Sequence, residues 1–547
     1  MAPALGLGVS LPPNNAHALS VSMPKWEHVV GYEEGKPEVL DAMACGYPRF
    51  FYHPFVVALT QLLKTRAPFA EYFPSAADGA GDKQEQAWNL MVSPTLVTAQ
   101  RLQSFLIASA KNDPKIDDVD GDNDVTVTSV QDLVWAVRFP HRLSPTAKQF
   151  WQHSGEIVSS RHAEIVLKAL KEEESASATA ESLLLQVNQT ATHKQLHERI
   201  ASLYLGDSTE ASSNVFVYPT GMGAIFASVR LVNKIRPGAK SILFGFPYVD
   251  TLKILSRSEW CANGVYFFPV CDVKEMQEVE EILKREPILG IFTEFPGNPL
   301  LSTPDLTRLA TLAHENGTVL VVDDTVGSYN VNVMHHGAAD IVATSLSKIF
   351  SGTCDIMGGS LVLNPAGPLY STLKQHISPD DAFIVKKDAK VLVQDSVDVL
   401  SRVAKANSSA SIIAQRLQTH PLVKSIYYPE FQENKEQFTK FLSNGSSDGK
   451  TQFGPLFSIV LKGGLPVATA FYDAVNIAKG PSLGTNFTIC CPYTLLAHYY
   501  ELEFVESCGV DRNLIRISIG LEATEEIWSE IDSALQAATK VYVPKSA

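Results

Sequence analysis

A lysine, an aspartate and two serines occur in an order that would allow covalent chemistry. Lys348 comes shortly after Ser345 and Ser347, and Asp323 lies upstream at the end of the apolar run 318–323. A lysine amine forms a Schiff base with a carbonyl group, an acid keeps a pyridine nitrogen protonated, and small hydroxyls bind a phosphate. Pyridoxal phosphate needs all of these groups. The four residues therefore predict a pyridoxal phosphate site.

Three short motifs upstream of Asp323 could complete this site. Gly221 and Met222 follow an apolar run and begin a helix-like stretch, where backbone N–H groups can approach a phosphate. Tyr248 offers a ring that can stack on a planar heterocycle, and Asn298 can reach a phenolic oxygen. Each motif also has an ordinary interpretation as a turn. Their order along the chain, together with the lysine and the aspartate, favours the cofactor site.

The elements that must position these residues are short apolar runs separated by helix-like stretches. Continuous apolar strands that alternate with helices are typical of a parallel sheet buried on both faces. In such sheets ligands bind beyond the carboxyl ends of the strands, where the residues named above lie. The predicted strands are 214–218, 241–245, 264–269, 288–293 and 318–323.

The chain divides into three regions with different sequence patterns. Residues 1–194 are divergent and contain loop insertions, and residues 195–384 hold the alternating strands and helices of a large cofactor-binding domain. Residues 385–547 begin with a long helical segment and continue with mixed strands and helices, which predicts a smaller α+β domain. The predicted fold class is α/β with a mostly parallel central sheet in the large domain.

Composition restricts the partners and the location. The 547 residues carry a formal net charge of −14, which argues against nucleic acid and anionic membranes as partners. No stretch is apolar for the roughly 18 residues that a membrane span needs. Seven scattered cysteines fit reduced thiols, and the proline-broken N-terminus has no charged side chain before Lys25, unlike a secretory signal. We therefore expect a cytoplasmic protein.

No metal site is expected. The acidic segment 117–124 has the spacing of a calcium loop at its start. However, Asn123 stands where such a loop needs glycine, and Ser129 stands where it needs glutamate. A solvated acidic loop explains the segment better.

The segment 195–547 resembles the cystathionine γ-synthase class of the Cys/Met-metabolism pyridoxal-phosphate enzymes, and the N-terminal region resembles the fungal subgroup of that class. The resemblance implies an aminotransferase-like (type I) fold and assembly as a homodimer or homotetramer. The motifs that carry it are Thr220-Gly-Met-Gly-Ala224, Tyr248-Val-Asp-Thr251, Glu294-Phe-Pro-Gly-Asn-Pro299, Asp323-Asp-Thr325, Ser345-Leu-Ser-Lys348, Gly352-Thr-Cys-Asp-Ile-Met-Gly-Gly359 and Leu514-Ile-Arg-Ile-Ser-Ile-Gly-Leu-Glu522.

Residue roles follow from the same resemblance. Lys348 and Tyr248 are implied as catalytic, and Arg516 and Ser482 as substrate-binding, with Arg516 holding the substrate α-carboxylate as a bidentate partner. The family's Tyr-Ser-Arg, which reaches the phosphate of the neighbouring subunit, corresponds to Arg161 or to the pair Tyr47 and Arg49. The sequence favours Arg161. The remaining implied cofactor ligands are Gly221, Met222, Asn298, Asp323, Thr325, Ser345 and Ser347.

The activity implied is γ-replacement on an O-acylhomoserine with cysteine to give cystathionine, a transsulfuration step of methionine biosynthesis. Phe487 stands where the family has a glutamate near the substrate. Replacement with another sulfur or carbon nucleophile in a specialised pathway therefore remains an alternative. A non-catalytic homologue is a further alternative, against which the retention of both Asp323 and Lys348 argues.

Overall fold

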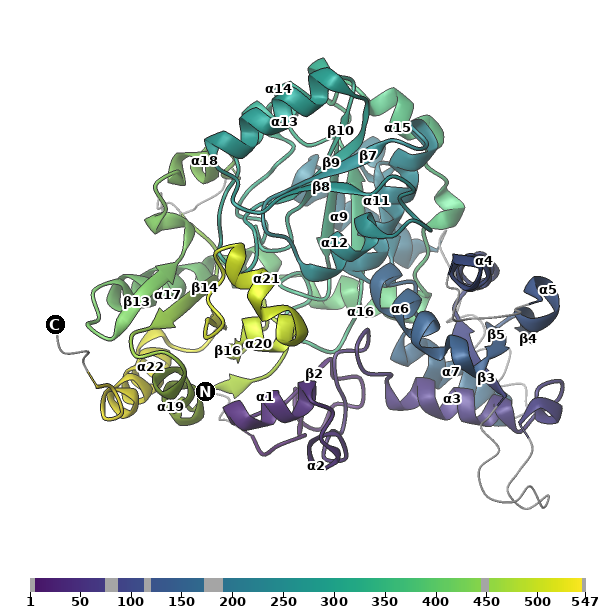
Figure 1. The fold of residues 1–547 in the computed structure, drawn as a ribbon, viewed down its shortest axis with the longest axis horizontal. Helices are drawn as coiled ribbons and strands as arrows, with labels where there is room; N and C mark the ends of the chain where they lie inside the picture. The colour runs from purple at the N-terminus through teal and green to yellow at the C-terminus, as the bar shows by residue number, and fades with distance from the viewer. Residues whose placement is uncertain (1–4, 74–86, 113–119, 172–189, 444–451, 544–547) are drawn as a thin grey trace.

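A seven-stranded sheet forms the centre of the computed structural model, which describes residues 5–73, 87–112, 120–171, 190–443 and 452–543 (Figure 1). The strand order across the sheet is β6-β12-β11-β10-β9-β7-β8. The strands are β6 (Val215–Tyr218), β7 (Lys240–Phe244), β8 (Val265–Phe268), β9 (Ile288–Glu294), β10 (Val319–Asp323), β11 (Ile341–Ser345) and β12 (Gly359–Leu363).

Six of these strands share one direction, and β12 runs antiparallel to both of its neighbours. The sequence predicted five of the parallel strands, but it predicted neither β11 nor β12 and therefore not this reversal. A parallel neighbour needs a crossover long enough for a helix. The segment between β11 and β12 contains no α-helix and folds back directly, so β12 returns beside β11 in the opposite direction.

Alternate residues of one strand enter two different cores. Leu320 and Val322 of β10 belong to the cluster that includes helix α14 (Leu306–Glu315). Val319 and Val321 belong to a second cluster formed with helix α11 (Gly221–Ile235) on the opposite face. Burial on both faces explains why the strands are apolar throughout rather than alternating.

The C-terminal region is a second layer around a five-stranded sheet of order β13-β14-β17-β16-β15 (Figure 1). Its strands are β13 (Val423–Tyr427), β14 (Leu456–Leu461), β15 (Ala478–Lys479), β16 (Ile489–Pro492) and β17 (Ile515–Ser518). Helices α17 (Val399–Gln418) and α19 (Leu465–Ala474) pack on β14, and α22 (Thr524–Thr539) packs on α17 and α19. The predicted α/β fold with a smaller α+β region is confirmed.

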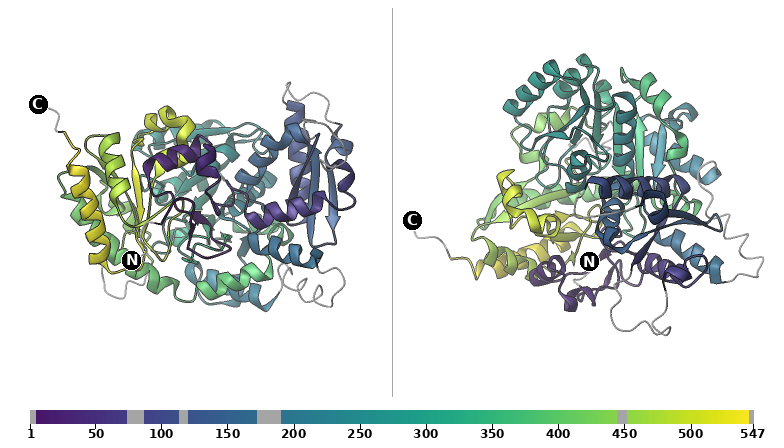
Figure 2. Two further views of the ribbon diagram at one scale, coloured as in Figure 1. Left: turned by 90° about the horizontal axis from the view of Figure 1, so that it is seen from below. Right: turned by 45° about the vertical axis from the view of Figure 1, so that its right-hand side comes forward.

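Residues 23–33 pack against the C-terminal region, far away in sequence. Helix α1 (Trp26–Glu33) lies on α19 and on α20 (Tyr493–His498) (Figure 2). The Trp26 backbone N–H donates to the Asp473 carboxylate at 2.8 Å, and the Tyr472 hydroxyl donates to the Met23 carbonyl at 2.8 Å. Strands β1 (Ser10–Leu11) and β2 (Ser20–Val21) form a two-stranded ribbon nearby.

A separate layer with its own apolar core stands to one side of the large sheet (Figure 2). It consists of the antiparallel sheet β3-β5-β4 and four helices. Its elements are β3 (Trp88–Ser93), β4 (Thr126–Val130), β5 (Val134–Pro140), α3 (Pro54–Lys64), α4 (Leu96–Asn112), α6 (Ser144–Ser154) and α7 (Ser160–Lys171). The domain boundaries at 194 and 384 stay a prediction.

The described residues form further α-helices. They are α2 (Pro37–Leu40), α5 (Gly121–Asp124), α9 (Ala191–Tyr204), α10 (Thr209–Ser212), α12 (Val249–Ser256), α13 (Val273–Arg285), α15 (Tyr370–His376), α16 (Lys386–Asp395), α18 (Lys435–Thr439) and α21 (Leu502–Ser507). Within the described ranges, no helix combines the length and the apolar character that crossing a bilayer requires. Part of the acidic segment 117–124 lies outside the described residues.

Candidate active site

The turn between β6 and α11 is capped and held tightly. Thr220 is the N-cap of α11, where its hydroxyl accepts from the Gly223 N–H at 2.9 Å and donates to the Gly155 carbonyl at 2.9 Å. A Cβ atom on Gly221 would lie 2.7 Å from the Cβ of Ser345. The predicted phosphate turn and the predicted serine are therefore neighbours, with glycine required by their close approach.

The turn after β11 fixes the lysine. The Ser345 N–H donates to the Thr325 hydroxyl at 2.8 Å, and the Gly358 N–H donates to the Ser347 hydroxyl at 3.0 Å. Arg402 of α17 donates to the carbonyls of the two residues after the lysine, at 2.9 and 2.8 Å. The backbone around Lys348 is thus held on both sides, and only its side chain extends into the site.

The amine of Lys348 contacts Ser482 of the C-terminal region and Tyr47 of the N-terminal segment. Its Nζ donates to the Ser482 hydroxyl at 3.3 Å and lies 4.5 Å from the centre of the Tyr47 ring. Burial alone would raise the pKa of the Tyr47 phenol, but the positive charges of Lys348 and Arg49 outweigh it and lower the pKa. The N-terminal segment therefore completes the surroundings of the lysine.

The buried carboxylate of Asp323 has no cationic partner among the described residues. Its Oδ1 accepts from the Thr325 N–H at 2.9 Å, and within the described ranges no Lys, Arg or His pairs with it. Withdrawal from water raises the pKa of Asp323, and burial together with the Asp323 charge raises the pKa of neighbouring Glu294. A protonated ring nitrogen beside Asp323 would relieve this cost. The carboxylate thus suits the pyridine nitrogen of pyridoxal phosphate.

Asp324, the next residue, faces a different environment. Its carboxylate accepts from the Tyr204 hydroxyl at 2.8 Å and from the Thr344 hydroxyl, and it is 1% exposed. Burial raises the pKa of Asp324 to about 7. The two adjacent aspartates therefore lie in different networks, and among the described residues the donor to Asp323 comes from its own turn.

Glu294 joins two of the predicted motifs. Its carboxylate accepts from the backbone N–H of Tyr248 and from that of Asn298, the latter at 3.0 Å. Sequence reasoning did not assign Glu294, although it begins the Glu-Phe-Pro-Gly-Asn-Pro motif. It holds the turn after β7 and the turn after β9 in register.

Tyr248 lies against Arg49. The guanidinium donates to the Tyr248 hydroxyl and to the Asp250 carboxylate, the latter at 2.5 Å, and Arg49 and Asp250 are both buried. Burial raises the pKa of the Tyr248 phenol well above its usual value. The sequence analysis did not assign a role to Asp250, although its place within the Tyr248–Thr251 motif could have indicated one.

Arg516 has no acidic partner among the described residues. Its guanidinium donates to the Asn298 side-chain oxygen at 3.0 Å and to the Ser482 carbonyl at 2.9 Å, and it lies 4.5 Å from the Tyr493 ring centre. The Asn298 amide donates to the Tyr493 hydroxyl at 2.8 Å. Tyr493 is a further site residue that sequence reasoning did not assign. A buried cation with only neutral partners suits a ligand carboxylate.

The turn that carries Ser482 needs glycine. Gly484 has φ +67°, and a Cβ atom there would lie 2.6 Å from the Ile349 nitrogen. Its N–H donates to the Ser518 hydroxyl at 2.8 Å, which ties the turn to β17. The C-terminal region is thereby locked onto the residue next to Lys348.

Arg161 contacts Asp355 rather than the residues described above. Its guanidinium donates to the Asp355 backbone carbonyl at 2.6 Å and pairs with the Asp355 carboxylate at 3.2 Å. None of the contacts of the described residues brings Arg161 to Gly221 or Ser345. The structure instead places the alternative pair, Tyr47 and Arg49, beside Lys348 and Tyr248 within the same chain.

Comparisons with known proteins identify the family of this chain. A model of the Cys/Met metabolism PLP-dependent enzyme family matches residues 169–536, and one of the fungal trans-sulfuration enzyme N-terminal domain matches residues 74–159. Cystathionine gamma-synthase of Neurospora crassa is 36% identical over 98% of this chain and 99% of its own length. The cystathionine gamma-synthase-like enzyme iboG2 of Amanita muscaria is 36% identical over 98% of this chain and 97% of its own.

The fold has solved counterparts. Cystathionine gamma synthase of Xanthomonas oryzae pv. oryzae superposes with a TM-score of 0.56 at 22% identity, over 65% of this chain and 87% of that chain. Fold and site thus define a pyridoxal-phosphate-dependent enzyme built on this scaffold. The chain belongs to the Cys/Met metabolism PLP-dependent enzyme family, and the predictions of family, cofactor and enzyme class are confirmed.

Proposed function

We propose that this enzyme catalyses γ-replacement on an O-acylhomoserine with cysteine, releasing the carboxylic acid and forming cystathionine. The observation that carries the proposal is the place of Ser482. Its hydroxyl accepts from Lys348 at 3.3 Å, and its carbonyl accepts from Arg516 at 2.9 Å. An α-amino acid whose carboxylate binds Arg516 therefore has its α-carbon within the reach of the lysine amine.

Each residue has a distinct part in this proposal. Bound pyridoxal phosphate supplies an electron sink for carbanions at the substrate carbon atoms. Asp323 would hold the ring nitrogen protonated, and Gly221, Met222, Ser345 and Ser347 would receive the phosphate. Lys348 would bind the cofactor and then move the α- and β-protons of the substrate. Tyr248 would cover the ring, and Asn298 accepts from Arg516 and positions it.

For the phosphate clamp we propose Tyr47 and Arg49 rather than Arg161. Arg49 contacts Tyr248 directly and the Tyr47 ring lies 4.5 Å from the Lys348 amine, whereas the contacts of Arg161 are with Asp355. We propose further that the enzyme is a homodimer or homotetramer in the cytoplasm and serves methionine biosynthesis. The cytoplasmic assignment is supported by its seven cysteines, all of which are free thiols.

The test is product analysis. Purified enzyme is incubated with cysteine and, in turn, with O-acetyl-, O-succinyl- and O-phosphohomoserine, and products are identified by mass spectrometry. Cystathionine from one of the acylated donors is the expected result. The Lys348→Ala variant is the control for non-enzymatic addition. Turnover of none of the three donors would contradict the proposal.

A second candidate is γ-replacement with another sulfur or carbon nucleophile. It is favoured by Phe487, which is half-buried and packs in the cluster that includes Leu11 and Ile489. A phenylalanine cannot hold the amino group of an incoming cysteine as a carboxylate does. Sulfide and an acetoacetate-type carbon acid, offered in competition with cysteine, distinguish the two candidates by the mass of the product.

A further inference from the structure

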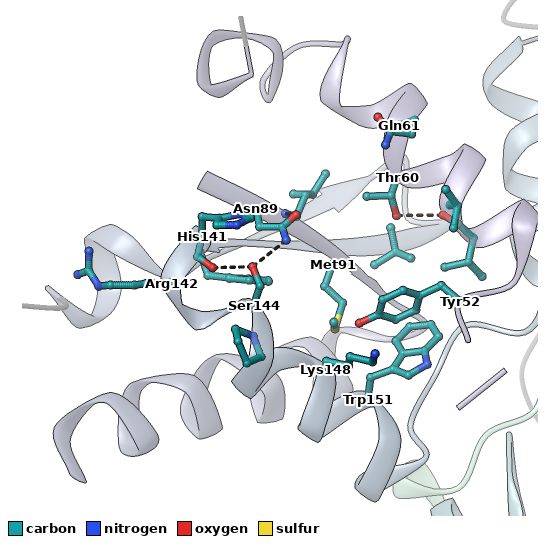
Figure 3. A pocket seen from close by; sticks show the side chains of 16 residues that line it. Tyr52, Thr60, Gln61, Asn89, Met91, His141, Arg142, Ser144, Lys148 and Trp151 are labelled. Carbon is teal, nitrogen blue, oxygen red and sulfur yellow. Dashed lines mark hydrogen bonds between the residues drawn. The ribbon is translucent and has the colours of Figure 1, made fainter. Parts of the chain in front are cut away.

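An open groove lies in the N-terminal layer, away from the lysine. It is formed between α3, β3 and α6 and encloses about 630 Å³ (Figure 3). This volume lies within the range typical of small-molecule sites, about 300–1,000 Å³. None of the contacts described above for the cofactor site involves its walls, apart from the C-terminal end of α6.

The floor of the groove is apolar and aromatic. The rings of Tyr52 and Trp151 meet edge to face at 5.1 Å, and the side chain of Met91 extends beside them (Figure 3). Val57 of α3 is 43% exposed on the rim. A flat hydrophobic ring could pack here against two aromatic side chains and a thioether.

The charge of the groove is opposite to that of the chain as a whole. Its described lining includes the exposed Lys148 and no aspartate or glutamate, although acidic residues outnumber lysine and arginine in the chain, 59 to 45. The amine of Lys148 lies beside Trp151 (Figure 3). At the other end, the Asn89 amide donates to the Ser144 hydroxyl at 2.9 Å. The groove thus combines an apolar floor with a cationic rim.

We propose that this groove is an effector site for a small organic anion that carries an aromatic or other flat apolar ring. The ring covers Tyr52, Met91 and Trp151, and the anionic group lies at Lys148. Charge complementarity selects an anion over a neutral or cationic ligand.

Helix α6 connects the groove with the active site. One side of α6 lines the groove, and the Trp151 indole N–H donates to the Pro48 carbonyl at 2.9 Å. The next residue, Gln152, accepts from Arg49 at 2.6 Å through its carbonyl and donates to Asp250 at 3.1 Å through its amide. A ligand that shifts Trp151 therefore acts on the turn carrying Tyr47 and Arg49. This coupling rests on the proposed role of that turn at the cofactor.

The binding test uses 8-anilinonaphthalene-1-sulfonate, an aromatic anion whose fluorescence rises in apolar sites, with the folded holoenzyme. We expect saturable binding of one molecule per chain. Val57→Asp places a charge on the apolar rim, and Lys148→Glu reverses the charge beside the sulfonate, so each should weaken binding about ten-fold. Neutral N-phenyl-1-naphthylamine should bind about ten-fold more weakly than the sulfonate, because it lacks the charge that pairs with Lys148.

Matched substitutions control for surface effects. Val273 is an exposed valine in the first turn of α13, as Val57 is in α3, and Lys405 is an exposed helical lysine on α17. Val273→Asp and Lys405→Glu should bind the probe as the wild type does. Equal probe binding by all four variants at equal melting temperatures would overturn the proposal. A change of oligomer mass in Val57→Asp, measured by sedimentation, would overturn it in favour of a subunit interface.

The coupling has its own readout. Saturating probe should change the visible absorption of bound pyridoxal phosphate or its dissociation rate in the wild type. Trp151→Phe keeps a ring on the groove floor but loses the indole N–H to Pro48, so it should bind the probe and show a smaller change. An unchanged cofactor signal in the wild type at full probe occupancy would reject the coupling. Because probe binding needs no turnover, this outcome is separate from failure of the proposed reaction.

Discussion

The cofactor site and the N-terminal groove differ in how they are encoded. At the proposed cofactor site, Lys348, Asp323 and Arg516 are each proposed to bind a specific chemical group, and each stands in a short motif. At the groove, Val57, Met91 and Trp151 contribute surface, which other apolar residues could also supply. Chemistry restricts residue type and spacing, whereas a binding surface restricts shape and polarity. The first is therefore visible in a sequence, and the second appears only after folding.

The two regions also meet at a small number of contacts. Helix α6 lines the groove with Trp151 and contacts Arg49 with Gln152, and Arg49 contacts Tyr248. The following substitutions test how independent the two regions are.

Lys348→Ala should have the largest effect. Without the amine, the cofactor loses its covalent attachment and the substrate loses its proton carrier, so kcat/KM should fall by at least about 10⁴-fold. The wild type should be yellow and retain the label on Lys348 after borohydride treatment, as peptide mass spectrometry would show. A colourless wild type after reconstitution with pyridoxal phosphate would refute the site assignment.

Asp323→Asn should come next. The substitution removes the charge that keeps the ring nitrogen protonated while preserving shape, so kcat should fall by about 10²-fold or more. Cofactor occupancy, measured by absorbance after dialysis, should fall far less than turnover. Unchanged turnover would mean that another group protonates the ring.

Arg516→Lys separates charge from geometry. A lysine keeps the positive charge but loses the planar fork that binds a carboxylate at two points. We expect KM for the acyl-homoserine to rise by about ten-fold or more, since a charge-assisted hydrogen bond is lost. The visible spectrum of the enzyme without substrate should not change. Normal KM would place the carboxylate anchor elsewhere.

Arg49→Ala and Arg161→Ala test the junction between the regions. Because Arg49 contacts Tyr248 and Arg161 pairs with Asp355, only Arg49→Ala should release pyridoxal phosphate faster on dialysis, by about ten-fold. Because Arg49 lies beside Tyr248 of its own chain, a mixture of Lys348→Ala and Arg49→Ala subunits that exchange should not regain activity. Restored activity would show instead that the clamp is shared between subunits.

Asp324→Asn should have the smallest effect, and it should be confined to stability. Folding raises the pKa of Asp324 from 3.8 to about 7, so its stabilising contribution is complete below pH 3.8 and is lost as the pH rises to about 7. The unfolding free energy of the wild type should therefore decline relative to the variant by up to about 1.4 kcal/mol per pH unit in this window. Thermal melts at pH 5, 6, 7 and 8 measure the difference. Parallel curves would contradict the assignment of the pKa to Asp324.

Much of the large domain could be predicted, and for a common reason. Strand β10 is apolar from Val319 to Val322 because both of its faces are covered, and Asp323 and Lys348 lie at or just after strand ends, where ligands bind. The reversal of β12 could not be predicted, because its residues satisfy a buried strand of either direction. The choice between Arg161 and Arg49 also failed to follow from sequence, since both stand in plausible motifs.

The sequence by itself determined the family and the cofactor and predicted the residues on which the chemistry depends, because a Schiff base, a pyridine nitrogen and a carboxylate each accept few partners. Only the tertiary structure decided which arginine lies beside Tyr248, that Asp323 and Asp324 enter different networks, and that Trp151 joins a groove to the active-site turn. These are contacts between segments distant along the chain. Their geometry depends on how the layers pack, and short-range patterns do not contain it.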